Sequence, residues 1–134
     1  MNLFEIASKY IGIPFKEHGR DLDGLDCYGL ILLFYKELGY KLDDYRYKPD
    51  WFKEGYNLFL ENYYKYAERI PENQTITPGD AILFKGFVES PTHIGIYLGK
   101  GKFLHSLRKT GVVISELNQE PFISRLEGRF KLKK

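Results

Sequence analysis

The segment Gly24-Leu25-Asp26-Cys27-Tyr28-Gly29-Leu30 contains the only cysteine of the 134-residue chain and begins its clearest helix. Apolar residues recur after the cysteine on one helical face, at Leu30, Ile31, Phe34 and Leu38. Asp26 is a suitable N-cap and Gly39 a suitable C-terminal stop, so the pattern predicts a helix over residues 26–38. Cys27 would then lie in the first turn, where the helix dipole favours an anion and lowers the pKa of a thiol.

A lone cysteine is, in general, more often a small buried side chain than a nucleophile. The nucleophilic interpretation therefore depends on partners elsewhere in the chain. A single cysteine also excludes an internal disulfide, so the fold does not depend on an oxidising compartment.

The length and the 43% hydrophobic content suit one core, and we expect a single domain over residues 1–134. A net charge of +2 is too balanced to predict nucleic-acid binding. The first ten residues are amphipathic and lack the features of a signal peptide, and no segment has the ~20 apolar residues of a membrane span. We expect a soluble protein made in the cytoplasm.

Helical periodicity in the first part of the chain gives way to alternation in the second. The pattern predicts a helix over 3–11, a loop over 15–25 and the cysteine helix over 26–38. The expected strands cover residues 79–84, 92–98, 102–106, 112–114 and 129–132. Helices followed by an antiparallel meander indicate an α+β domain.

The segment from Tyr40 to Arg69 is unusually aromatic. Aromatic residues recur there at helical spacing, at Phe52, Tyr56, Phe59 and Tyr63, and predict a helix over 50–68. Such a stripe is typical of core packing, although tyrosines also suit a wet groove that binds sugar or peptide.

Two histidines lie on adjacent strands of one predicted hairpin. A three-residue loop over 99–101 would place His105 opposite Gly95 and would send His93 and His105 to the same face as diagonal neighbours. A two-residue loop would send them to opposite faces. The loop therefore decides whether the two imidazoles can meet.

One cysteine and two histidines form a plausible activated-thiol site. A thiol nucleophile needs an adjacent base, and the base needs a group that orients it. Cys27 would be the nucleophile, His93 the base and His105 the orienting group. The same residues could bind zinc, with His18 as the spare histidine, but the short ligand spacings typical of zinc sites are missing.

These motifs resemble the NlpC-type cell-wall cysteine peptidases of the papain-like group. The matching segments, in order, are Gly24 to Leu30, Pro78-Gly79-Asp80-Ala81-Ile82-Leu83-Phe84, His93-Ile94-Gly95-Ile96-Tyr97-Leu98-Gly99 and Gly101-Lys102-Phe103-Leu104-His105. Gly19-Arg20, Tyr28 and Glu37-Leu38-Gly39 are similar to the branch found in phage and prophage tails.

The resemblance implies a papain-like α+β fold and hydrolysis of peptidoglycan stem peptides, typically at the γ-D-glutamyl bond to the diamino acid. It implies the same triad of Cys27, His93 and His105. The implied partners are the stem peptide and phage tail proteins. From the residues themselves we expect no cofactor, no metal and no membrane span. The implied place of action is the cell wall, as part of a phage particle or after lysis.

The chain departs from the family pattern beside the nucleophile. The family commonly has a tyrosine twelve residues before the cysteine, whose hydroxyl helps the oxyanion, and Phe15 stands there. The oxyanion would then depend on the Cys27 N–H and on another group such as Tyr28 or His18. The expected substrate-binding residues are Phe15, His18, Asp26 and Tyr28.

Two other functions compete with the peptidase. One is a structural domain of a phage tail that retains the fold with weak or no activity, which a missing triad residue would favour. The other is acyl transfer on lipids, as in the lecithin retinol acyltransferase group. That group has its histidine before its cysteine, and the order here is the reverse.

Overall fold

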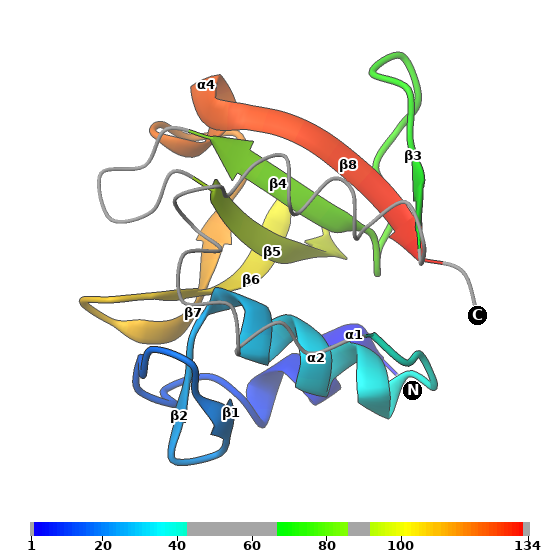
Figure 1. The fold of residues 1–134 in the computed structure, drawn as a ribbon. Coiled ribbons are helices and arrows are strands. Elements are labelled where there is room, and N and C mark those ends of the chain that lie inside the picture. Colours follow the sequence, from blue (N-terminus) through cyan, green and yellow to red (C-terminus); the bar gives the residue numbers. More distant parts are fainter. Residues whose placement is uncertain (1, 43–66, 86–91, 133–134) are drawn as a thin grey trace.

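The computed structural model describes residues 2–42, 67–85 and 92–132, and it has an antiparallel sheet with helices on both sides (Figure 1). The N-terminal elements are α1 (Leu3–Ser8), β1 (Arg20–Asp21), β2 (Gly24–Leu25) and α2 (Cys27–Glu37). The sheet and the last helix follow as β3 (Ala67–Arg69), β4 (Ala81–Lys85), β5 (Thr92–Gly99), β6 (Lys102–Leu107), β7 (Gly111–Glu116), α4 (Phe122–Arg125) and β8 (Leu126–Leu132).

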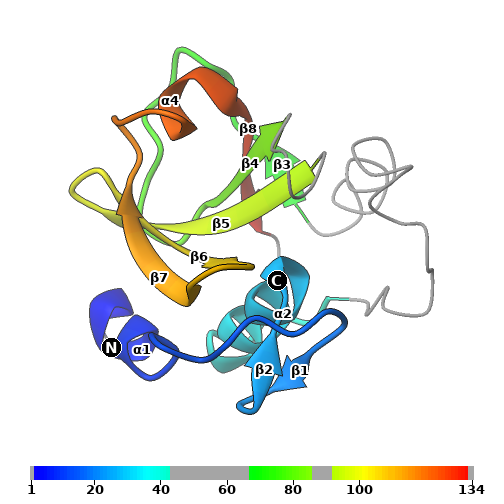
Figure 2. The ribbon, with the colours of Figure 1, turned by 90° about the vertical axis from the view of Figure 1, so that its left-hand side faces the viewer.

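Within the described residues, the main sheet has six strands in the order β3-β8-β4-β5-β6-β7, and all neighbours are antiparallel. Strands β4 to β7 form the predicted meander, and β8 returns along the free side of β4. Helices α1 and α2 lie together on one side of the sheet, and α4 lies on the other (Figure 2). The α+β class predicted from the sequence is confirmed.

Two hydrophobic clusters divide along the two faces of the sheet. The larger cluster joins α1 and α2 to alternate sheet residues such as Ile94, Ile96 and Leu104. The smaller cluster lies on the opposite face, where Phe84 and Phe103 are packed against Phe122 of α4 and its neighbours. Burial of both faces fixes the register, because a slip of one residue would exchange the two sets of side chains.

The cysteine helix begins as the sequence predicts. The side chain of Asp26 accepts a hydrogen bond from the Gly29 N–H at 2.7 Å and caps α2. Gly39 follows the end of the helix with φ of 91°, a conformation that glycine adopts without strain. The first helix is shorter than the predicted 3–11, since α1 ends at Ser8 and turn residues follow.

The hairpin of β5 and β6 has the predicted register but a different loop. Ile96 pairs with Leu104 and Tyr97 with Phe103, and this register puts Gly95 opposite His105. The turn itself is only Lys100-Gly101, both with positive φ, and Gly99 pairs with Lys102. A register shift between Tyr97 and Gly99 accommodates one extra residue in β5. The predicted three-residue loop is therefore wrong, and this bulge keeps both histidines on one face.

Long-range pairing accounts for the other differences from prediction. The loop over 15–25 contains the small hairpin β1–β2, and residues 67–68 belong to β3 instead of ending a helix. Strand β3 exists because it pairs with β8, which is remote in sequence. The rest of the predicted helix over 50–68 lies outside the described residues.

The packing of Gly29 makes a direct stability prediction. Ala is normally the better helix residue, but a Cβ on Gly29 would lie 2.1 Å from the Gly19 carbonyl oxygen. Gly29→Ala should therefore lower the free energy of unfolding by about 1–3 kcal/mol, measured by urea denaturation. Lys36→Ala, on the exposed side of the same helix, is the control and should change it by less than about 0.5 kcal/mol. A Gly29→Ala protein as stable as wild type would show that α2 does not lie this close to the preceding loop.

Candidate active site

A buried carboxylate fixes the start of α2. Besides capping the helix, Asp26 Oδ1 accepts a hydrogen bond from Arg20 at 2.8 Å, and Oδ2 accepts one from the His18 N–H at 2.9 Å. These contacts tie the preceding loop to the first turn of the helix. All of them are internal to the protein, and contact between Asp26 and substrate stays a prediction.

Cys27 is the first residue of α2, and its thiol lies against the start of β5. The sulfur accepts hydrogen bonds from the backbone N–H groups of Ile94 and Tyr28. Ile94 directly follows His93, so this contact brings the nucleophile helix to the histidine-bearing strand. The neighbouring strand β6 also contacts this region. The Ser106 hydroxyl donates to the Leu25 carbonyl at 2.8 Å and holds the segment that leads into α2.

The two predicted histidines meet in the structure. His93 Nε2 and His105 Nδ1 are 2.8 Å apart, and both side chains are buried, with exposed fractions of 5% and 0%. A Cβ on Gly95 would lie 2.9 Å from Phe103 Cδ2 and 3.0 Å from the Leu104 carbonyl oxygen, so glycine permits the close packing of β5 against β6 at this position. Nε2 of His93 is the ring nitrogen that faces His105.

A residue that the sequence analysis missed completes the chain of polar groups. His105 Nε2 lies 2.7 Å from the Ser115 hydroxyl on β7. Ser115 pairs with Phe103 and so lies on the same face as the histidines. The predicted strand over 112–114 stopped one residue short of it. Strand alternation could have identified Ser115. Val113 pairs with His105, and the residue two positions later in the same strand, Ser115, faces the same side.

Burial dominates the protonation of the site. It raises the pKa of the Cys27 thiol to about 12, with a further contribution from the Asp26 charge, while Arg20 and the two N–H donors oppose the rise. Burial also lowers the pKa of His93 to about 4. The sequence predicted a lowered thiol pKa at the helix start, and that prediction is wrong for this structure, because loss of hydration outweighs the dipole. Near neutral pH the site holds a thiol and a neutral imidazole.

The other predicted site residues surround the start of the helix. Phe15 lies beside it, because its neighbours Pro14 and Lys16 hydrogen-bond to Leu25, and the Arg108 guanidinium lies 4.9 Å from the centre of its ring. Tyr28 is buried, with Arg20 5.8 Å from its ring centre.

His18 has a positive φ of 61°, and its Nε2 is buried without a hydrogen-bond partner among the residues that the structure describes. The structure thus gathers His18 and the other predicted residues close to α2, but their contact with substrate stays a prediction.

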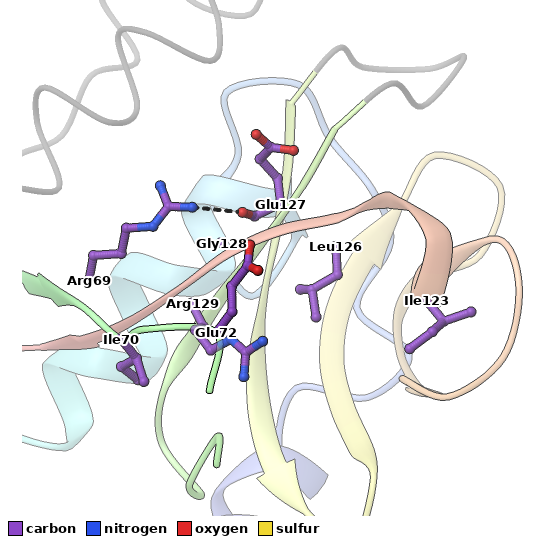
Figure 3. A pocket seen from close by; sticks show the side chains of 8 residues that line it. All are labelled: Arg69, Ile70, Glu72, Ile123, Leu126, Glu127, Gly128 and Arg129. Atoms are coloured by element: carbon purple, nitrogen blue, oxygen red, sulfur yellow. Dashed lines mark hydrogen bonds between the residues drawn. The ribbon is translucent and has the colours of Figure 1, made fainter. Parts of the chain in front are cut away.

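A pocket of about 250 Å³ lies elsewhere, along β3 and β8 (Figure 3). Its lining includes Arg69, which donates to the Glu127 carbonyl at 3.0 Å, together with Ile123 and Arg129. None of the predicted site residues lines it, so it is separate from the cysteine and histidine constellation. Within the described ranges, no three His, Cys, Asp or Glu side chains group as ligands for a metal ion, and no helix is long and apolar enough to cross a membrane.

Comparison with known protein families assigns this chain to one family. The model of the NlpC/P60 family matches residues 12–130. The chain belongs to the NlpC/P60 family. This match includes α2 with Cys27, both histidines and Ser115.

Curated relatives include hydrolases and a phage protein. The chain is 31% identical over 125 residues to the gamma-DL-glutamyl hydrolase of Bacillus subtilis, covering 91% of this chain and 27% of the relative. It is 32% identical over 82 residues to the tail tip assembly protein K of Escherichia phage lambda, covering 61% of this chain and 41% of that protein. It is 27% identical over 112 residues to the murein DD-endopeptidase MepS/murein LD-carboxypeptidase of Escherichia coli K12, covering 83% of this chain and 50% of that protein. The chain thus spans half or less of the length of these three relatives.

Solved structures support the fold. An NLP/P60 family protein similar to a lipoprotein from Staphylococcus aureus superposes with a TM-score of 0.71 at 22% identity, covering 98% of this chain and 40% of that one. The NlpC/p60 domain of the peptidoglycan hydrolase SagA superposes with a TM-score of 0.64 at 22% identity, covering 96% of this chain and 95% of that domain. The second match shows that a domain of nearly this length has the same architecture.

The neutral, buried His93 predicts how stability depends on pH. Above the ordinary pKa of 6.5 the imidazole is neutral in both the folded and the unfolded chain, so it has no effect. Between pH 6.5 and about 4 the unfolded chain takes up a proton that the folded chain does not. As the pH is lowered from 6.5 to about 4, the free energy of unfolding should therefore decrease, and this histidine should account for about 3 kcal/mol of the decrease.

Urea denaturation at several pH values measures this loss of stability. The His93→Gln protein should lose less stability than wild type between pH 6.5 and 4, because glutamine does not titrate. His105 acts in the same direction, since burial and the neighbouring His93 lower its pKa as well. Equal acid sensitivity in the two proteins would contradict a neutral His93.

Proposed function

We propose that this domain is a cysteine endopeptidase that hydrolyses peptidoglycan stem peptides. The observation that carries the proposal is the contact of the Cys27 thiol with the start of β5, beside a histidine that is hydrogen-bonded to a second buried histidine. This arrangement supplies a nucleophile, a base and a group that orients the base. Membership of the NlpC/P60 family supports it independently.

The reaction follows from the roles of these three residues. His93 Nδ1 takes the thiol proton as the Cys27 sulfur attacks the scissile carbonyl carbon, and the carbonyl oxygen becomes an oxyanion. The oxyanion collapses, the amine leaves with the proton from His93, and a thioester remains on Cys27. Water then attacks the thioester with His93 as base, which releases the acid and restores the thiol.

Proton transfer is needed during attack because the thiol is not ionised at rest. A buried thiol with a pKa of about 12 is a poor nucleophile until its proton leaves. His93 is neutral near pH 7 and so is ready to accept that proton. The backbone N–H of Cys27 and a group such as Tyr28 or His18 are the proposed oxyanion donors, because Phe15 has none.

The names of the relatives guide the choice of bond and setting. A gamma-DL-glutamyl hydrolase and a murein endopeptidase among them support the γ-D-glutamyl bond to the diamino acid as the target. The similarity to a phage lambda tail tip protein supports a phage or prophage tail role. On this proposal the protein is made in the cytoplasm and acts in the cell wall, within a phage particle or after lysis.

Hydrolysis of a stem tetrapeptide containing γ-D-glutamyl-diaminopimelate, followed by mass spectrometry, tests the proposal. Cys27→Ala should abolish turnover, and His93→Ala should lower kcat by about 10²–10⁴-fold, the usual contribution of a general base. His105→Ala should leave more activity, since it acts through His93. Ser124→Ala, on the exposed surface of α4, is the control and should match wild type.

Two outcomes would count against the assignment. Wild-type activity in His93→Ala would remove the base from the mechanism. A wild-type protein that sediments with purified peptidoglycan but releases no peptide product would favour the competing function, a structural tail domain with a retained fold.

A further inference from the structure

We propose that Ser115 is a positioning residue of this site, which sets the tautomers of both histidines so that His93 presents an unprotonated Nδ1 to the thiol. The inference rests on the proposed function and extends it by one residue. It concerns a side chain on β7, the strand at the edge of the sheet, which lies two strands away from β5.

The geometry is a continuous line of three polar groups. His93 Nε2 lies 2.8 Å from His105 Nδ1, and His105 Nε2 lies 2.7 Å from Ser115 Oγ. His105 is fully buried, so its two ring nitrogens have only these protein partners to satisfy them. Ser115 is half-buried, and this is the one hydrogen bond of its side chain among the described residues.

Counting protons along this line leaves two arrangements. Each imidazole is neutral near pH 7 and carries one proton, and the short contact between the rings holds one proton, not two. In the first arrangement His93 donates from Nε2 to His105, and His105 donates from Nε2 to Ser115. In the second, Ser115 donates to His105, and His105 donates from Nδ1 to His93.

Only the first arrangement leaves a base. When His93 carries its proton on Nε2, its Nδ1 has a lone pair that can accept the proton of Cys27. In the second arrangement Nδ1 is already protonated and cannot accept. Ser115 can be the acceptor that the first arrangement needs, since its half-buried hydroxyl can donate its own proton to water.

No proton moves along this line during the reaction. When His93 takes the thiol proton, its Nε2–H stays donated to His105, and the His105 Nε2–H stays donated to Ser115. The serine therefore holds His105 in the acceptor state that stabilises the imidazolium of His93. This role is positional, and it requires no charge on His105.

The first measurement uses the unmodified protein. Imidazole ¹⁵N spectra of the full chain near neutral pH report which nitrogen of each histidine carries the proton. The proposal predicts the Nε2–H tautomer for both His93 and His105. An Nδ1–H tautomer at His105 would overturn it without any variant being made.

The second measurement compares variants on β7. Ser115→Ala should shift His105 toward the Nδ1–H tautomer and lower kcat between about twofold and tenfold, the usual effect of one lost hydrogen bond, with KM unchanged. Ser115→Thr keeps the hydroxyl and should restore both values. Val113→Ala removes packing from the same strand and the same face, and it should keep the wild-type tautomers even if stability falls.

The outcomes separate this inference from the proposed function. Wild-type tautomers and wild-type kcat in Ser115→Ala would overturn the role of Ser115 while leaving the peptidase intact. A wild-type protein without hydrolytic activity would count against the proposed function, and the imidazole spectra would still decide whether Ser115 sets the tautomers.

Discussion

The hydrogen bond between the buried imidazoles of His93 and His105 is the constraint on which the site depends. It forms because a bulge in β5 keeps both residues on one face, and Gly95 permits the close approach of β5 and β6 between them. The Cys27 thiol belongs to a different element, α2, and contacts the Ile94 N–H directly after His93. The Asp26 carboxylate fixes the start of α2 by three internal hydrogen bonds. On the proposed mechanism, the sheet supplies the base and the capped helix supplies the nucleophile.

Burial gives this site its chemical character. A thiol in the first turn of a helix would normally gain acidity from the dipole. Here the sulfur is enclosed, and the cost of charging it without water raises its pKa instead. The same burial keeps His93 neutral and able to accept a proton. The resting site is thus a neutral pair, and its reactivity depends on proton transfer as the bond to substrate forms.

Features that depend on short stretches of sequence were predicted better than features that depend on contacts between distant segments. The cysteine helix and its Asp26 cap follow from short-range patterns. The shared face of the histidines was predicted from a three-residue loop, whereas the structure reaches it through a two-residue turn and a bulge in β5. Strand β3 could not be predicted, because it forms by pairing with β8 far along the chain. The thiol pKa and the contact of Ser115 with His105 could not be predicted either, since both depend on which segments pack together in three dimensions.

Ultraviolet thiolate absorbance as a function of pH tests the neutral resting pair most directly. The difference between wild type and Cys27→Ala isolates the one cysteine of the chain. A neutral thiol and imidazole should give no thiolate signal from about pH 5 to about pH 9, with ionisation only in more alkaline solution. A thiolate that forms below neutral pH in wild type, and disappears in His93→Ala, would show a preformed ion pair and contradict the neutral resting state.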